Sequence, residues 1–255
     1  MSRLGLLYHN IERITKARNL GRRMRLKENG FLFKCDTLKP VFYLPLYKKD
    51  YIQQLILTEA NYYDHKNLFY LCKEWNNGMV AKNLQNGCIL DIGANIGNHT
   101  LFFFFECGVK KAICFEPVDS TYHILKRNME INHLTPNATL VKSAVGATRG
   151  TATVSHYEKD NIGATQIALD ETGSIPVVSI DSMHFDEEIK LIKIDVEGFE
   201  TSVIDGCLET LAKYGPYIMI EILPENLAYI TEKLSGLGYR YLKLSDYEIN
   251  YFFYK

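Results

Sequence analysis

The segment Cys88-Ile89-Leu90-Asp91-Ile92-Gly93-Ala94-Asn95-Ile96-Gly97-Asn98-His99-Thr100 decides the fold of this chain. It predicts an apolar strand that ends in an acid, a turn with two glycines, and then a helix. Glycine lets the backbone approach a ligand closely, and the first N–H groups of a helix have no partner within it. The segment therefore predicts a nucleotide-type pocket, with an ordinary strand-to-helix turn as the alternative.

Strand and helix patterns alternate from this segment to the end of the chain. Strands are expected at 88–92, 111–115, 138–142, 189–194, 217–222, 239–244 and 249–254, with further β-like runs at 150–157 and 175–180 around a polar loop at 161–165. Helices are expected at about 97–106, 119–132 (capped by Asp119 or Ser120), 200–213 and 225–236. This order predicts an α/β fold with a doubly wound, mostly parallel, seven-stranded sheet that ends in an antiparallel hairpin.

The residues before this pattern predict an accessory region, 1–80, in front of a main domain at 81–255. Residues 3–27 show helical spacing, and residues 1–27 hold eight Lys or Arg against one acid, a local net charge of +7. Such a helix can lie on an anionic membrane surface or simply pack on the domain. Residues 29–48 predict short strands, and 50–74 predict helix with aromatic residues that either line an acceptor site or pack on the sheet.

Composition and cysteine usage limit the class of protein. Hydrophobic residues make up 47% of the 255 residues and charged residues 23%, which is typical of a soluble globular chain. None of the six cysteines forms a C-x-x-C pair, which favours a reducing compartment. No apolar run reaches a membrane-spanning length, so we expect a cytoplasmic protein, with peripheral membrane contact through residues 1–27 as an option.

The ends of successive predicted strands carry polar residues that can converge on one crevice. Glu116 ends the second strand, 25 residues after Asp91, where an acid can accept two hydrogen bonds from a ribose diol. That acid suits either NAD or S-adenosylmethionine. The turn Gly93–Gly97 lacks the third glycine of a dinucleotide fingerprint and is preceded by an acid, a pattern that favours a ligand with a ribose, an amino acid end and no phosphate.

Three blocks of the sequence resemble the signature of FkbM-type S-adenosylmethionine-dependent methyltransferases. They are DIGANIG at 91–97, FEP at 115–117 and KIDVEGFE at 193–200, and the resemblance covers roughly residues 85–222. It implies the class I methyltransferase (Rossmann-like) fold. It also implies methyl transfer to oxygen, often to a sugar hydroxyl on a natural product or a surface glycan.

The resemblance also implies roles for individual residues. The residues expected to bind S-adenosylmethionine are Asp91, Gly93, Asn95 and Gly97 at its methionine end, Glu116 at the ribose, and Ser143 and Ala144 near the adenine, together with Asn98 and Pro117. Asp195 and Glu197 are expected beside the transferred methyl group.

Methyl transfer to a sugar hydroxyl needs a base within reach of the attacking oxygen. The candidates are Asp195, Glu197, His99 and Glu221, and we favour a structural or cofactor-side role for His99. Two acids at a strand end can also hold Mg²⁺, but no third ligand is evident, so no metal site is predicted.

The sequence therefore predicts an S-adenosylmethionine-dependent O-methyltransferase that acts on a saccharide or glycoconjugate and not on nucleic acid. Two alternatives stay open, an NAD-dependent oxidoreductase on a similar sheet and a non-catalytic cofactor-binding scaffold at a membrane.

Overall fold

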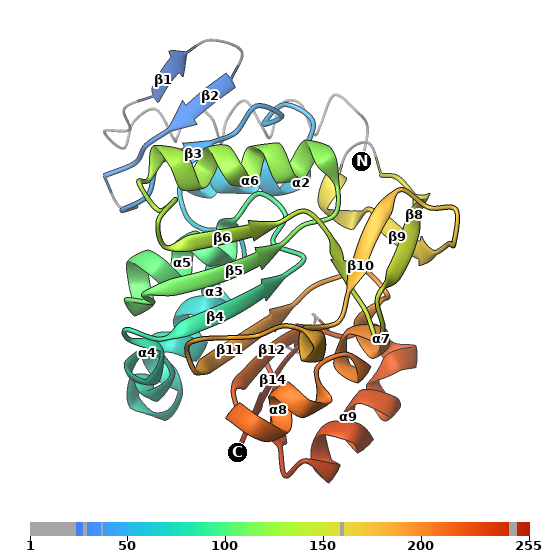
Figure 1. The fold of residues 1–255 in the computed structure, drawn as a ribbon. Helices are drawn as coiled ribbons and strands as arrows, with labels where there is room; N and C mark the ends of the chain where they lie inside the picture. The colour runs from blue at the N-terminus through green and yellow to red at the C-terminus, as the bar shows by residue number, and fades with distance from the viewer. Residues whose placement is uncertain (1–23, 28–29, 37, 159–160, 245–248) are drawn as a thin grey trace.

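A computed structural model describes residues 24–27, 30–36, 38–158, 161–244 and 249–255. Its centre is a seven-stranded sheet in the order β13-β14-β12-β11-β4-β5-β6 (Figure 1). The bounds are β4 Cys88–Ile92, β5 Lys111–Phe115, β6 Ala138–Val141, β11 Ile189–Ile194, β12 Tyr217–Glu221, β13 Arg240–Lys243 and β14 Asn250–Tyr254. Strand β14 runs antiparallel to both of its neighbours, and the other four pairs are parallel. The predicted doubly wound sheet with its terminal hairpin is confirmed.

Helices cover both faces of this sheet. The first face carries α2 Tyr51–Glu59, α3 His65–Phe69, α4 Met79–Leu84, α5 Asn98–Cys107 and α6 Asp119–Ile131, and the second carries α7 Glu200–Asp205, α8 Leu208–Tyr214 and α9 Leu227–Gly236. A π-helical turn at Tyr70–Glu74 and a 3-10 turn at Trp75–Gly78 join α3 to α4. Every residue of β4 is buried, as expected for a central parallel strand covered on both faces.

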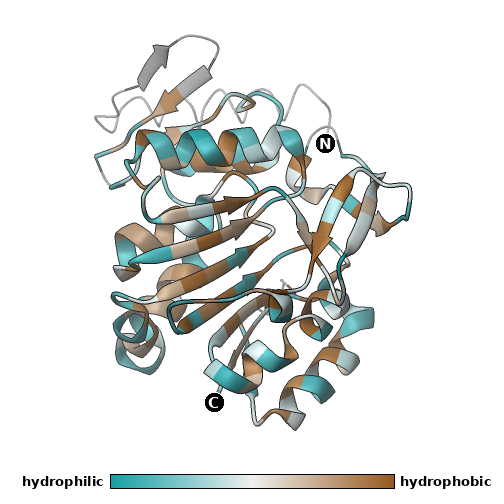
Figure 2. Cartoon of the chain, viewed as in Figure 1, coloured by the Kyte–Doolittle hydropathy of each residue, from teal (hydrophilic) through white to brown (hydrophobic). Residues whose placement is uncertain are grey.

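Successive residues of β4 point into two separate apolar cores. Ile89 packs with α5, while Leu90 packs with the helices of the opposite face. The colouring by hydropathy shows the same pattern, with apolar residues along the central strands and polar residues on the outer helix surfaces (Figure 2).

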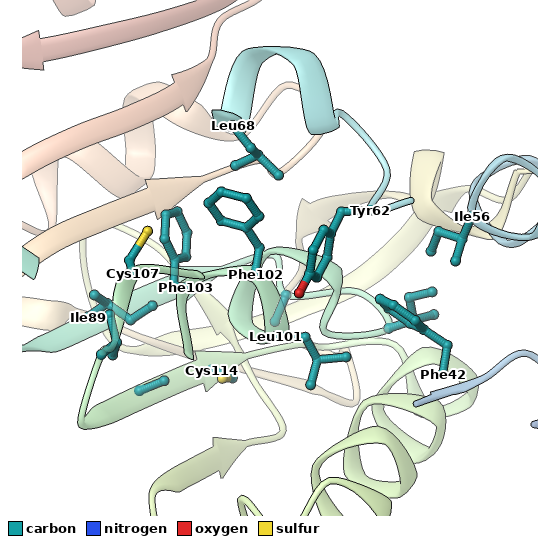
Figure 3. Close-up of a cluster of buried hydrophobic side chains, with 14 of the residues drawn as sticks. Phe42, Ile56, Tyr62, Leu68, Ile89, Leu101, Phe102, Phe103, Cys107 and Cys114 are labelled. Carbon is teal, nitrogen blue, oxygen red and sulfur yellow. The ribbon is translucent and has the colours of Figure 1, made fainter. Parts of the chain in front are cut away.

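The first core contains a group of edge-to-face aromatic rings (Figure 3). Phe102 of α5 contacts Tyr62 at 5.2 Å and Phe69 at 5.3 Å between ring centroids. Phe42 contacts Tyr62 at 6.0 Å. Residues on both sides of the expected boundary near residue 80 therefore share one core.

Two smaller sheets accompany the main one. Strands β7 Ala144–Val145, β10 Ile175–Val178, β8 Gly150–His156 and β9 Gln166–Leu169 form a four-stranded sheet in that order. Figure 1 shows β8, β9 and β10 beyond the carboxyl ends of β4, β5 and β6. A 3-10 turn at Ile162–Ala164 lies between β8 and β9, and β9 itself was not predicted.

The third sheet corrects the prediction for the N-terminal region. Residues 1–23 lie outside the described residues, but β1 (Met24–Lys27) is a strand and not the end of a helix. It pairs antiparallel with β2 (Gly30–Phe33), which pairs with β3 (Phe42–Tyr43). Apolar and basic residues alternate along Met24–Lys27, and this two-residue period outweighs the helical spacing.

Two helix predictions differ in detail from the structure. Val118 occupies the N-cap position of α6, so neither Asp119 nor Ser120 caps the helix. The expected helix at 200–213 is two helices, because α7 ends before Gly206 and α8 begins at Leu208. A Cβ added at Gly206 would lie 2.1 Å from the carbonyl oxygen of Gly146. The helix is therefore interrupted at the point where the two backbones meet. Within the described part of the chain, no helix is long and apolar enough to cross a membrane.

Candidate active site

Two adjoining cavities lie at the carboxyl ends of the parallel strands. The smaller cavity, about 320 Å³, is bounded by the ends of β4 and β5, the segment after β6 and the loop at 161–165. The larger cavity, about 520 Å³, is bounded by α2, α3 and the ends of β11 and β12. Tyr63, Asp195 and Glu221 line both. The two cavities therefore adjoin at these three residues.

Most of the predicted site residues line one of these cavities. The smaller cavity holds Gly93, Asn95, Glu116, Pro117, Ser143, Ala144 and Glu197, the larger holds His99, and Asp195 and Glu221 line both.

The glycine turn is compact because another loop lies directly against it. Gly93 has a φ of +75°, and a Cβ there would lie 1.8 Å from the carbonyl oxygen of Asp195. No other residue type fits this position, since both the conformation and the space require glycine. The turn and the segment after β11 therefore form one continuous wall of the smaller cavity.

Glu116 is held rigidly at the base of the smaller cavity. Its Oε1 accepts hydrogen bonds from Val118 N at 2.9 Å and Thr121 Oγ1 at 2.8 Å, and its Oε2 accepts from Asn95 N at 2.8 Å. Burial raises the pKa of Glu116, and these three donors act against that rise. A carboxylate accepts about four hydrogen bonds, so Oε2 keeps one free position. The hydrogen bonds between Glu116 and a ribose diol stay a prediction.

Two buried polar atoms in the smaller cavity have no hydrogen-bond partner among the described residues. They are Ser143 Oγ and Asn161 Oδ1. Buried polar groups normally have partners, and each one without a partner needs an explanation. A polar ligand in the smaller cavity would supply both.

A buried lysine outside the predicted site residues connects the glycine turn to the segment after β11. Lys193, in β11, is 3% exposed and donates a hydrogen bond to the carbonyl oxygen of Gly93 at 2.7 Å. Its Nζ lies 3.3 Å from Asp195 Oδ2 and 3.4 Å from Asp91 Oδ1. Burial lowers the pKa of Lys193, but the carboxylates of Asp195 and Asp91 raise it above its usual value overall.

The signal for Lys193 was present in the sequence. A lysine inside the apolar run Ile189–Ile194 is unusual for a strand buried on both faces, because a buried charge requires a charged partner. The acids on the neighbouring strand and immediately downstream were available as partners.

Three residues expected to contact the cofactor line neither cavity. Asp91 is fully buried, and its carboxylate accepts a hydrogen bond from Thr100 Oγ1 and faces Lys193. A Cβ on Gly97 would lie 2.7 Å from Leu125 Cδ1, so this glycine allows α6 to pack closely. Asp91 and Gly97 therefore support the cavity wall from behind, and their contact with a ligand stays a prediction.

Asn98, the third of these residues, holds Tyr63 in place. Its Oδ1 accepts from Tyr63 N at 2.9 Å, and its Nδ2 donates to Tyr63 O at 3.0 Å. Tyr63 then lines both cavities, whereas the adjacent Tyr62 packs in the core. The aromatic region at 50–74 thus contributes both to the cavity walls and to the apolar core.

The acids at the ends of β11 and β12 are close enough to affect one another. Burial and the charges of Asp195 and Glu200 raise the pKa of Glu197 to about 7. Burial and the charges of Asp195 and Glu197 raise the pKa of Glu221 to about 8. Both carboxyls therefore exchange protons near neutral pH.

His99 has the opposite character. Burial and the nearby charge of Lys193 lower the pKa of His99 to about 3, so the imidazole is neutral at physiological pH. The near-neutral pKa that made His99 a candidate base is therefore absent. Among the described residues, no group of three or more His, Cys, Asp or Glu side chains is arranged to hold a metal ion.

Comparisons with known proteins agree with this architecture. A model of the methyltransferase FkbM domain matches residues 91–241. The methyltransferase sdnD of Sordaria araneosa is 23% identical over 162 residues, which cover 50% of this chain and 62% of that protein. The crystal structure of the FkbM methyltransferase from Methylobacillus flagellatus superposes with a TM-score of 0.51 at 15% identity, covering 96% of this chain and 59% of that chain.

The chain thus spans about three fifths of the length of each of these two relatives. The structural likeness shows that the fold is the class I methyltransferase (Rossmann-like) fold, as the sequence predicted. The domain match extends over more than half of the chain and includes the glycine turn, Glu116 and the acids after β11. The chain belongs to the FkbM methyltransferase family.

Proposed function

We propose that the protein is an S-adenosylmethionine-dependent O-methyltransferase whose acceptor is a hydroxyl of a saccharide or glycoconjugate. The observation that carries this proposal is the junction of the two cavities at Tyr63, Asp195 and Glu221. Methyl transfer requires a cofactor and an acceptor to meet in line at one carbon atom, and positioning supplies much of the rate. Membership of a methyltransferase family argues against the NAD-dependent oxidoreductase alternative.

The residues of the smaller cavity suit the cofactor. Glu116 has one free acceptor position for a ribose hydroxyl, and Ser143 Oγ and Asn161 Oδ1 lack partners that the adenine can supply. The methionine end would lie along Gly93 and Asn95. When bound, S-adenosylmethionine supplies a methyl group activated by a sulfonium.

The larger cavity suits an uncharged polyhydroxylated acceptor. Tyr51 and Tyr63 contribute aromatic surface, with ring centroids 6.5 Å apart, against which the apolar face of a sugar ring can lie. The acids Glu59, Asp195 and Glu221 offer hydrogen-bond acceptors for hydroxyl groups and disfavour an anionic group beside them.

We assign the role of general base to Glu221. It lines both cavities, and a base is most effective when its pKa lies near the working pH, as the value of about 8 for Glu221 does. The bound cofactor would supply the methyl group for a new C–O bond at the acceptor and would leave as a neutral thioether. The hydroxyl proton passes to the Glu221 carboxylate.

Calorimetry with S-adenosylhomocysteine tests the cofactor assignment. Glu116→Ala should lose about 10- to 100-fold in affinity, because a hydrogen bond between the ribose and a buried carboxylate is removed. Thr121→Val is the matched control, since it removes one contact of Glu116 but leaves the carboxylate in place, and its affinity should stay near that of the wild type. Wild-type affinity in Glu116→Ala would refute the ribose assignment.

Mass spectrometry of surface glycans, produced with and without the active protein, tests the acceptor class. We expect a gain of one methyl group on a sugar hydroxyl, and a loss of about 10²–10⁴-fold in turnover for Glu221→Gln. Cofactor binding without turnover on any saccharide would favour the scaffold alternative.

A further inference from the structure

The loop at 161–165 forms one side of the smaller cavity and contains the turn Ile162–Ala164. A Cβ added to Gly163 would lie 2.4 Å from Asn95 Nδ2 and 3.0 Å from Ile52 Cδ1. The loop is therefore in close contact with both the glycine turn and helix α2.

Helix α2 contributes to both cavities. Ile52 lines the smaller cavity, while Tyr51, Leu55 and Glu59 line the larger one. A shift of this helix would change the shape of both cavities together.

One buried carboxylate joins the loop to the helix. Asp50 is 3% exposed, and its Oδ1 caps α2 by accepting from Gln53 N at 3.0 Å. Its Oδ2 accepts from Ile162 N at 3.2 Å, across 112 positions of sequence. Hydrogen bonds from backbone N–H groups to a buried carboxylate are stronger than neutral ones, so this link is well suited to transmit a displacement.

We propose that Asp50 is a positioning residue that couples cofactor binding in the smaller cavity to the geometry of the acceptor cavity, through its hydrogen bond from Ile162 N. A ligand that contacts the 161–165 loop fixes Ile162, and Asp50 then fixes the first turn of α2. Filling the smaller cavity therefore favours one shape of the larger cavity, and by linkage the cofactor raises the affinity for the acceptor. This inference rests on the proposed function.

The test uses a substitution that separates the two roles of Asp50. Asparagine and serine cap helices about as well as aspartate does. Asp50→Asn presents an N–H₂ group to the N–H of Ile162 when its oxygen caps α2, and Asp50→Ser is too short to reach the loop. Both variants should keep the cap and lose the link. The second variant keeps the test available if the first does not fold.

Asp181 provides a matched control remote from both cavities. Its carboxylate likewise accepts backbone N–H groups at the start of a helix, from Glu209 at 3.0 Å and Thr210 at 2.9 Å. Asp181→Asn should leave cofactor affinity unchanged.

Hydrogen exchange and calorimetry with S-adenosylhomocysteine give the readouts. In Asp50→Asn, the Ile162 amide should exchange at least tenfold faster while the Gln53 amide keeps its protection, and affinity should fall about tenfold. S-adenosylhomocysteine should slow exchange in residues 51–59 of the wild type but not of the variant.

The coupling would be overturned if Asp50→Asn and Asp50→Ser bound S-adenosylhomocysteine with wild-type affinity. It would also be overturned if the ligand protected residues 51–59 equally in the wild type and the variants. Either result would leave the proposed function intact. Failure of the wild type to bind S-adenosylhomocysteine would overturn the proposed function, and this proposal with it.

Discussion

Replacing Lys193 by methionine should destabilise the chain mainly through the charges that it leaves behind. The side chain keeps its length and packing but loses the ammonium that faces Asp91 and Asp195 and donates to Gly93 O. Asp91 is fully buried, and its Oδ1 has no hydrogen-bond partner in the described part of the chain. Removing one member of a buried ion pair costs about 3–5 kcal/mol, because the other charge stays buried. We expect a loss in this range.

Urea unfolding followed by circular dichroism near neutral pH measures this loss. The double variant Asp91→Asn/Lys193→Met removes the stranded charge together with the cation, so it should be more stable than Lys193→Met alone. Lys142→Met is the surface control, because the Lys142–Asp119 pair is well exposed and should contribute little. If Lys193→Met lost no more stability than Lys142→Met, or if the double variant recovered nothing, the electrostatic account of Lys193 would be wrong.

Three further perturbations follow from the same structure. The pKa of Glu221 is about 8 in the folded chain, and the pKa of an unperturbed Glu is about 4.3. Ionisation of Glu221 therefore lowers the stability of the folded chain as the pH rises from about 4.3 to about 8. Glu221→Gln should therefore melt higher than the wild type at about pH 8.5 and nearly equally at about pH 4.5 in calorimetric scans. Gly97→Ala should lower the free energy of unfolding by about 1–3 kcal/mol, because φ is +86° and the new Cβ would meet Leu125. A change under about 0.5 kcal/mol in chemical unfolding would contradict the close approach of Leu125. Phe102→Ala should lower the free energy of unfolding by about 3–5 kcal/mol in the same assay, since Phe102 is fully buried among aromatic rings. A loss of about 0.5 kcal/mol or less, as for a surface substitution, would contradict that packing.

The seven-stranded sheet was predictable because its signal is local. Four of the six residues of Ile189–Ile194 are apolar, and an acid stands on each side of the run, so the predicted and observed limits of β11 agree. The strand ends then bring Glu116, Asp195 and Glu221 to one edge by a general property of parallel sheets.

The supporting contacts were not predictable in the same way, because they join residues far apart in sequence. A lysine in a buried strand indicates a charged partner, but it does not indicate that Asp91, about a hundred residues earlier, is that partner. In the same way, nothing near Asp50 indicates its contact with Ile162. The role of Asn98 in holding Tyr63 is equally non-local. Tertiary contacts also decide which of two local patterns is used, as the strand at Met24–Lys27 shows.

The central claim is that the smaller cavity binds S-adenosylmethionine with its reactive end toward the larger cavity. A crystal structure of the complex with S-adenosylhomocysteine tests it most directly. We expect a ribose hydroxyl on the free acceptor position of Glu116, the adenine beside Ser143, and the sulfur at the junction formed by Asp195 and Glu221. A ligand bound outside the smaller cavity, or one whose sulfur points away from Asp195 and Glu221, would contradict the account.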